Sequence, residues 1–369
     1  MGGSSAEVDM KGTGKPRRGI DERLAQHGYV VLEDVVSKEA VLDPLLACLS
    51  RNLAARASER SGPAPIEMTA SRGPSSRPAP PAALAEDEAV APARVTVRRC
   101  GDDDTGEPGG QVTRQLLALA GAGETWMGQA LDVSLPQGGV DKATPMLLEP
   151  EVFALLADPA LLDVLEGVLG PTIWLSPVGH TRLKLPRALA PSSNGILGDV
   201  PWHQDNGVLL EEADDLDVVT VWIPLLDATL ETGCLQVIPT PRRAALLDHC
   251  GGRGGLRIPD AILPASDPVP LPMRRGSVLL MHARTVHSSL PNQTTTSVRI
   301  SMDLRYQAVE HPTGRPQFPA CLLRDVPSSQ RQPVDFAQWR ARWLRARDDA
   351  AGRQLGAFNR WDLGAPVCA

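Results

Sequence analysis

Short extended runs separated by glycine- and proline-containing turns dominate the second half of the chain. The runs cover residues 172–184, 217–226, 233–239, 276–286 and 297–307, and no helical period lies between them. Frequent strands without intervening helices favour an antiparallel barrel or sandwich. We therefore expect a mainly β core over residues 171–310, with helices at its flanks.

Three side chains within this core form a candidate metal site. His203 and Asp205 are two residues apart, so in an extended segment they point to the same face. His287 can reach them from a neighbouring strand, whereas His282, five residues earlier, would face the other way. Two histidines and one carboxylate with an open opposite face are typical of non-haem Fe(II) oxygenases. The alternative is a structural His203–Asp205 hydrogen bond, with His287 at a turn.

Ordered motifs surround these three residues. They are Pro-Trp-His-Gln-Asp at 201–205, Thr-Val-Trp-Ile-Pro-Leu at 220–225, Gly-Cys-Leu-Gln-Val-Ile-Pro at 233–239, His-Ser-Ser-Leu-Pro-Asn at 287–292 and Asp-Leu-Arg-Tyr-Gln at 303–307. Together they resemble the phytanoyl-CoA dioxygenase (PhyH) family of Fe(II)/2-oxoglutarate-dependent oxygenases. The similarity covers roughly residues 20–60 and 145–310 and is dense after about residue 170. It implies a double-stranded β-helix (jelly-roll) core in which His203, Asp205 and His287 hold Fe(II).

The resemblance also predicts how the co-substrate binds. Arg299, twelve residues past His287, is the candidate partner of the distal carboxylate of 2-oxoglutarate, since arginine can bind both carboxylate oxygens. Arg305 is the competitor, although an ion pair with Asp303 is its simpler role. Ser289 could hydrogen-bond the same carboxylate. Lys184 is either a further pocket residue or an exposed lysine at a strand end.

Outside the core, the pattern predicts one oxygenase domain over residues 19–369, preceded by a disordered tail at 1–18. Residues 61–110 contain a Pro-, Ala- and Ser-rich tract without a period and are expected to form a flexible insertion. Asp158, Pro159 and Gly170 are typical start and stop signals of a helix. A C-terminal helix at 333–356 either covers the barrel or meets a partner subunit in a homodimer.

Composition excludes several other classes of function. Acidic residues outnumber basic ones by 44 to 37 without a basic run, which argues against nucleic-acid binding. No apolar run is long enough to span a membrane. The six cysteines are scattered without a CxxC pair, which favours a reducing cytoplasm over a disulfide framework.

The sequence therefore predicts a cytoplasmic Fe(II)/2-oxoglutarate-dependent dioxygenase. It would use O2 to hydroxylate or otherwise oxidise a C–H bond of a small-molecule metabolite or natural-product intermediate, releasing succinate and CO2. Two alternatives stay open: a metal-dependent jelly-roll enzyme that does not use 2-oxoglutarate, and a catalytically silent binding module of the same fold.

Overall fold

The computed structural model describes residues 16–61, 109–136, 138–190, 196–252, 255–327, 331–355 and 360–368. Apart from their ends, the predicted tail and the predicted insertion at 61–110 lie outside this part of the chain. None of the described helices is both long and apolar enough to cross a membrane.

Two antiparallel sheets form the core. The larger has seven strands, β1 (Tyr29–Leu32), β9 (Val278–His282), β4 (Val219–Pro224), β11 (Arg299–Gln307), β2 (Thr172–Leu175) and β12 (Cys321–Asp325) in that order, with β3 (His180–Lys184) also paired to β11. The smaller contains β10 (Val286–Ser289), β5 (Leu235–Ile238) and β8 (Val269–Leu271), and a hairpin joins β6 (Cys250–Gly252) to β7 (Gly255–Arg257). This arrangement confirms the mainly β jelly-roll prediction. Strands β1 and β12, from outside 171–310, complete the larger sheet.

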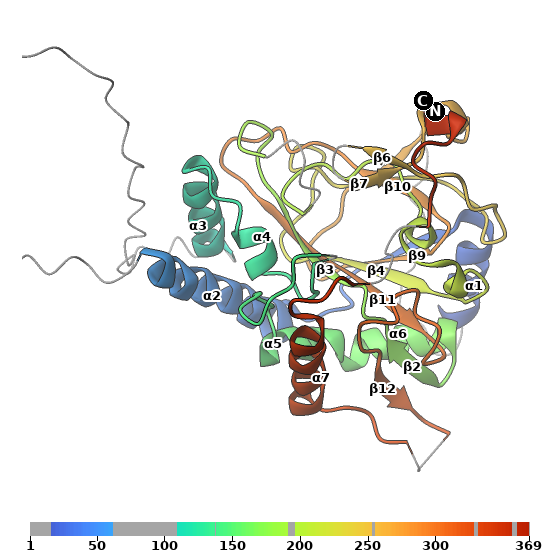
Figure 1. Ribbon diagram of the computed structural model, residues 1–369. Coiled ribbons are helices and arrows are strands. Elements are labelled where there is room, and N and C mark those ends of the chain that lie inside the picture. The colour runs from blue at the N-terminus through green and yellow to red at the C-terminus, as the bar shows by residue number, and fades with distance from the viewer. Residues whose placement is uncertain are drawn as a thin grey trace, which may run out of the picture.

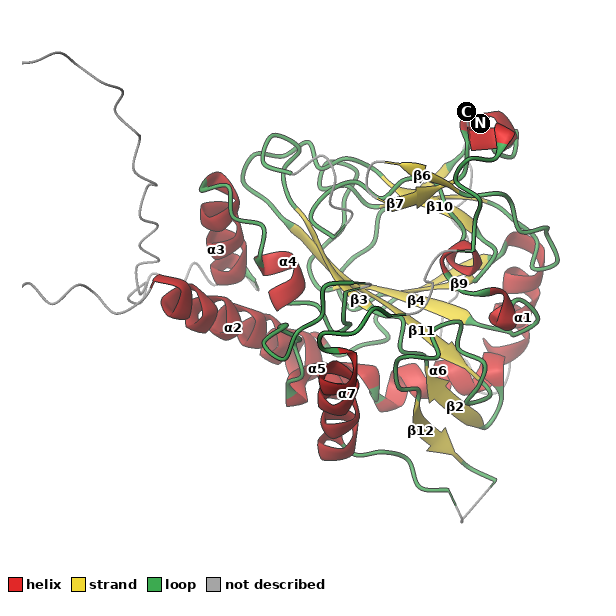
Figure 2. Cartoon of the chain, in the orientation of Figure 1, coloured by secondary structure: helices red, strands yellow, loops and turns green. Residues whose placement is uncertain are grey.

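Helices flank the larger sheet. They are α1 (Pro16–His27), α2 (Asp43–Ser61), α3 (Gly110–Gly121), α4 (Met127–Ala130), α5 (Pro150–Leu156), α6 (Pro159–Leu169) and α7 (Phe336–Ala350). α5, α6 and α7 lie on one side of this sheet, and β6, β7 and β10 lie on the other (Figure 1; Figure 2). The predicted start of α6 is confirmed, because the Asp158 carboxylate accepts a hydrogen bond from Leu161 N at 2.9 Å.

Strand β11 explains how the sheet separates two environments. All nine of its residues are buried, so its two faces differ in polarity rather than in exposure. Ile300, Met302, Leu304 and Tyr306 alternate along one face and belong to the apolar cluster that includes α6 and α7 side chains. The residues that alternate with these four face the space between the two sheets, and they are Arg299, Ser301, Asp303 and Arg305. The interior next to β11 is therefore ionic.

The run at 276–286, predicted as one strand, is two strands in different sheets. β9 ends at His282, where Thr285 N donates a hydrogen bond to His282 O at 2.9 Å, and β10 starts at Val286. The turn contains neither glycine nor proline, so no local signal marks it. As a result, His282 and His287 lie on different sheets. The prediction that they lie on opposite faces of one strand is wrong, because they do not share a strand.

Candidate metal centre

His203, Asp205 and His287 converge in the interior. Their potential ligand atoms all lie within 4.8 Å of one another, and each residue is at most 6% exposed. A β-bridge joins the two histidines: the backbone N of each donates to the backbone O of the other at 3.0 Å. The prediction that Asp205 continues an extended segment is wrong, because Asp205 begins a 3-10 turn at 205–208. The turn still directs its carboxylate to the same point.

Backbone carbonyls fix the orientation of both imidazole rings. His203 Nδ1 lies 2.9 Å from Pro201 O, and His287 Nδ1 lies 3.0 Å from Thr285 O. Since a carbonyl can only accept, each Nδ1 carries a proton, and in the neutral form of each ring Nε2 has the lone pair that a metal-binding histidine requires. Burial and the nearby His203 lower the pKa of His287 to about 4, which keeps its ring neutral.

Two buried side chains hold the carboxylate of Asp205. Thr220 Oγ1 donates to Oδ2 at 2.5 Å, and Arg305 Nη2 donates to Oδ1 at 2.5 Å. Burial opposes ionisation of Asp205, but the charge of Arg305 outweighs it and keeps the pKa of Asp205 well below the usual range. The expected ion pair between Arg305 and Asp303 is present at 3.2 Å. The contact with Asp205, one hundred positions away in the sequence, was missed, and so was Thr220.

Arg299 lies beside the cluster, on the inner face of the larger sheet. Its Nε donates to Gly233 O at 3.2 Å, its Nη1 donates to Ser301 Oγ at 2.6 Å, and its guanidinium carbon lies 5.4 Å from the centre of the Trp222 ring. Gly233 adopts a positive φ of 85°, and a Cβ atom there would meet Leu290 O at 2.4 Å. Only glycine fits this turn, which carries the carbonyl that orients Arg299.

Lys184 and Ser289 join Arg299 from two other strands. Lys184 is the register partner of Arg299, and its Nζ donates to Ser289 Oγ at 2.5 Å. Lys184 is 1% exposed and also pairs with Asp199 at 3.0 Å, so the reading of an exposed strand-end lysine was wrong. Burial and the charge of Arg299 lower the pKa of Lys184 to about 7. The three predicted co-substrate residues thus form one buried group.

Two adjoining cavities meet at this cluster. The narrower is bounded by both histidines of the cluster and by Arg299, Trp222, Thr220 and Leu235. The larger has a volume of about 430 Å³, within the usual range of small-molecule sites. Both cavities are lined by Arg182, Val200, His203 and Arg305, so the cluster lies where they adjoin.

Two other histidines lie apart from the cluster. His282 Nε2 is 3.9 Å from Asp217, and it is not among the clustered ligand atoms. His249, which sequence reasoning did not single out, accepts a hydrogen bond from Gln204 N at 3.0 Å and stacks on Trp361 with ring centres 5.2 Å apart. It thereby supports the backbone between the first two candidate ligands.

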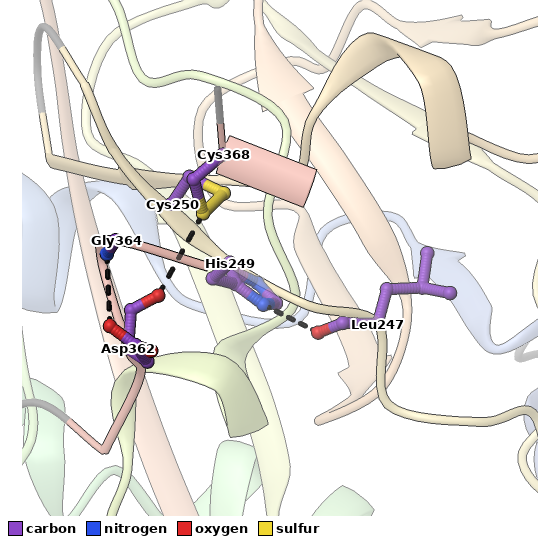
Figure 3. The surroundings of a disulfide bond; sticks show 6 residues. All are labelled: Leu247, His249, Cys250, Asp362, Gly364 and Cys368. Atoms are coloured by element: carbon purple, nitrogen blue, oxygen red, sulfur yellow. Dashed lines mark hydrogen bonds between the residues drawn. A yellow bond between two sulfur atoms is a disulfide. The ribbon is translucent and has the colours of Figure 1, made fainter. Parts of the chain in front are cut away.

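A disulfide joins the C-terminal segment to the hairpin at the mouth of the larger cavity. Cys250 in β6 and Cys368 are bonded, and Figure 3 shows the segment from Asp362 to Cys368 beside His249. The expectation that the cysteines stay unpaired is wrong here, because 118 residues separate two cysteines that only the fold brings together. Cys48, Cys234 and Cys321 are free and buried. Cysteine usage therefore no longer supports the predicted cytoplasmic location.

Loss of this disulfide is expected to lower the stability. The Cys368→Ser variant should lose about 2–4 kcal/mol of unfolding free energy, because the unfolded chain regains the freedom of a long loop. Urea unfolding with and without dithiothreitol measures the loss. Reductant should destabilise the wild-type protein by the same amount and leave the variant unchanged. A wild-type midpoint that does not respond to reductant would contradict the disulfide.

The fold and the buried cluster define a jelly-roll protein with a two-histidine, one-carboxylate site. The model of the family described as Phytanoyl-CoA dioxygenase (PhyH) matches residues 129–301, which confirms the resemblance. A phytanoyl-CoA dioxygenase of Arabidopsis thaliana is 32% identical over 106 residues, which are 28% of this chain and 37% of the relative. A 1-deoxypentalenic acid 11-beta-hydroxylase of Streptomyces arenae is 31% identical over 166 residues, 42% of this chain and 56% of the relative.

A similarity to a solved structure extends over nearly the whole chain. The apo form of ThoJ, a non-heme monooxygenase, superposes with a TM-score of 0.51 at 17% identity, covering 90% of this chain and 98% of the other. At this identity the match supports the fold alone.

Proposed function

We propose that this chain is an Fe(II)/2-oxoglutarate-dependent dioxygenase that oxidises a C–H bond of a small molecule. The observation that carries the proposal is the buried cluster of His203, Asp205 and His287 with both Nδ1 protons directed to carbonyls. Two neutral imidazole nitrogens and one carboxylate oxygen form a donor set that fits Fe(II). The family match and the name of the Streptomyces relative, a hydroxylase, support the same reaction class.

Iron bound there would supply the oxidising chemistry, using O2 and converting 2-oxoglutarate to succinate and CO2. The residues of the chain would bind and orient the iron and 2-oxoglutarate. Thr220 and Arg305 hold the carboxylate of Asp205 in place. Arg299, with Lys184 and Ser289, offers a buried guanidinium, an amine and a hydroxyl suited to the distal carboxylate of 2-oxoglutarate. Trp222 lines the narrower cavity beside the guanidinium of Arg299.

Anaerobic titration of the metal-free protein with Fe(II) and 2-oxoglutarate tests the proposal. We expect one Fe(II) per chain, a weak visible absorption band when 2-oxoglutarate is added, and succinate once O2 is admitted. Iron binding without consumption of 2-oxoglutarate would favour a metal-dependent enzyme of another class. Failure to bind iron at saturating concentration would favour a silent binding module.

A further inference from the structure

A histidine outside the metal cluster lines the larger cavity. His180 begins β3 and belongs to the wall of this cavity, which also includes His203, but it does not line the narrower one. Its neighbours on the same face of β3 are Arg182, which lines both cavities, and Lys184, the register partner of Arg299. Lys184 and His180 lie about 13 Å apart along the strand. His180 is therefore placed in the space left for the substrate, beyond the proposed co-substrate residues.

A buried carboxylate fixes the orientation of the His180 ring. Asp132 is 2% exposed, and its Oδ2 lies 2.9 Å from His180 Nδ1. Its Oδ1 accepts hydrogen bonds from the backbone N of Val133 at 2.8 Å and from the backbone N of Thr181 at 3.0 Å. Oδ2 is thus left to accept from His180. The neutral ring therefore carries its proton on Nδ1 and a lone pair on Nε2.

The Nε2 edge of His180 is left for a ligand. Within the described part of the chain no residue hydrogen-bonds this nitrogen, and 28% of the side chain stays exposed. Fastening the loop after α4 to β3 does not require the histidine, because the bonds of Asp132 to Val133 and Thr181 involve only backbone N–H groups. A buried carboxylate that orients a histidine in this way is a common device for presenting a proton acceptor to a substrate.

The wall around His180 favours a neutral hydrogen-bond donor. Apolar side chains supply much of this wall, namely Leu135, Val178, Leu256 and Phe318. An ammonium group would need an anion here, since burying an unpaired charge is costly. Among the described residues of the wall the carboxylate is that of Asp205, which Thr220 and Arg305 already hold. A hydroxyl group can donate to the lone pair of Nε2 without bringing a charge into the cavity.

We propose that His180 binds the substrate, and that the substrate is an alcohol with an apolar carbon skeleton whose hydroxyl donates to His180 Nε2. Asp132 acts through His180 as a positioning residue, since it determines which ring nitrogen accepts. The bound hydroxyl holds the skeleton in the cavity that also contains His203, and this determines which C–H bonds reach the metal position. The inference rests on the proposed function for the reaction, but not for the binding of the alcohol.

Two matched probes, borneol and camphor, test the inference. They share one bicyclic skeleton, but the hydroxyl of borneol can donate a hydrogen bond, whereas the ketone of camphor can only accept. The measurement is calorimetry on the purified protein without oxygen, in alkaline buffer so that the imidazole carries a single proton. We expect borneol to bind about tenfold more tightly than camphor. His180→Leu should remove this preference, and Asp132 keeps its two backbone donors in that variant.

Asparagine at position 132 should reverse the preference. Its side-chain oxygen takes over the two backbone donors, which places its NH2 group opposite His180 Nδ1. That nitrogen must then accept, so the neutral ring carries its proton on Nε2. Asp132→Asn should therefore bind camphor at least as tightly as borneol. This variant keeps the inference falsifiable if His180→Leu does not fold.

The controls separate a binding role from a structural one. His27, exposed at the end of α1, provides the matched control, and His27→Gln should behave as wild type. Equal weakening of both probes in His180→Leu would show a structural role and overturn the inference. So would equal binding of the two probes by the wild type, or a preference for borneol that survives in Asp132→Asn. A preference for borneol in a protein that does not consume 2-oxoglutarate would sustain the inference while refuting the proposed reaction.

Discussion

Alanine at Asp205 is expected to abolish iron binding and turnover and to destabilise the protein by about 3–5 kcal/mol, the usual effect of breaking a buried ion pair. The site loses the anion that complements a divalent cation. Arg305 keeps its 3.2 Å contact with Asp303 but loses the 2.5 Å contact with Asp205, so a charge is left buried beside the metal position. Asp205→Ala should therefore lower the affinity for iron more than the removal of a neutral ligand such as His203 would.

Iron content after anaerobic loading, succinate formation and urea unfolding measure the three effects. Turnover should fall by well over the roughly hundredfold lost when an outer partner of a metal ligand is removed. His203→Ala should lose iron but not the ion pair, so its unfolding free energy should change less. His282→Ala is the matched control, because this histidine lies outside the cluster, and it should keep both iron and activity. One iron per chain in Asp205→Ala would show that Asp205 is not a ligand.

Local patterns predicted the parts of the fold that depend on neighbours in the sequence. Asp158 caps α6 where the start signal placed it. The predicted strand at 297–307 is β11, since its apolar residues recur every second position. The proximity of His203 and His287 was predicted from the ordered motifs that resemble the family. Periodicity alone does not say which strands lie side by side.

The contacts that could not be predicted join residues far apart in the chain. Arg305 looked like the partner of Asp303, two residues away, because nothing local indicates that Asp205 lies within reach. The same holds for Cys250 and Cys368, whose pairing depends on the path of the C-terminal segment. In the sequence, ionic residues on an inner sheet face have the same alternating pattern as residues on an exposed polar face. Their burial, which decides their chemistry, therefore cannot be predicted without knowing that the second sheet covers them.

Replacing Arg299 with alanine is expected to raise the apparent KM for 2-oxoglutarate with iron binding retained. The lost contact is a buried hydrogen-bonded charge pair worth about 2–5 kcal/mol, which corresponds to roughly thirtyfold to several thousandfold in affinity. Iron should stay bound, because the hydrogen bonds of Arg299 go to Gly233 and Ser301 and not to the cluster. Arg299→Lys should give an intermediate KM, since lysine keeps the charge but not the planar fork.

Arg305→Ala separates the two buried arginines of β11. Its guanidinium contacts Asp205, so this variant should lose iron affinity and stability before it affects 2-oxoglutarate. Iron content and the KM for 2-oxoglutarate, measured on both variants at saturating iron, therefore distinguish a metal-supporting arginine from a co-substrate arginine. If Arg305→Ala raised the KM with iron retained and Arg299→Ala did not, the roles would be reversed. In that case 2-oxoglutarate would have to compete with Asp205 for the guanidinium of Arg305.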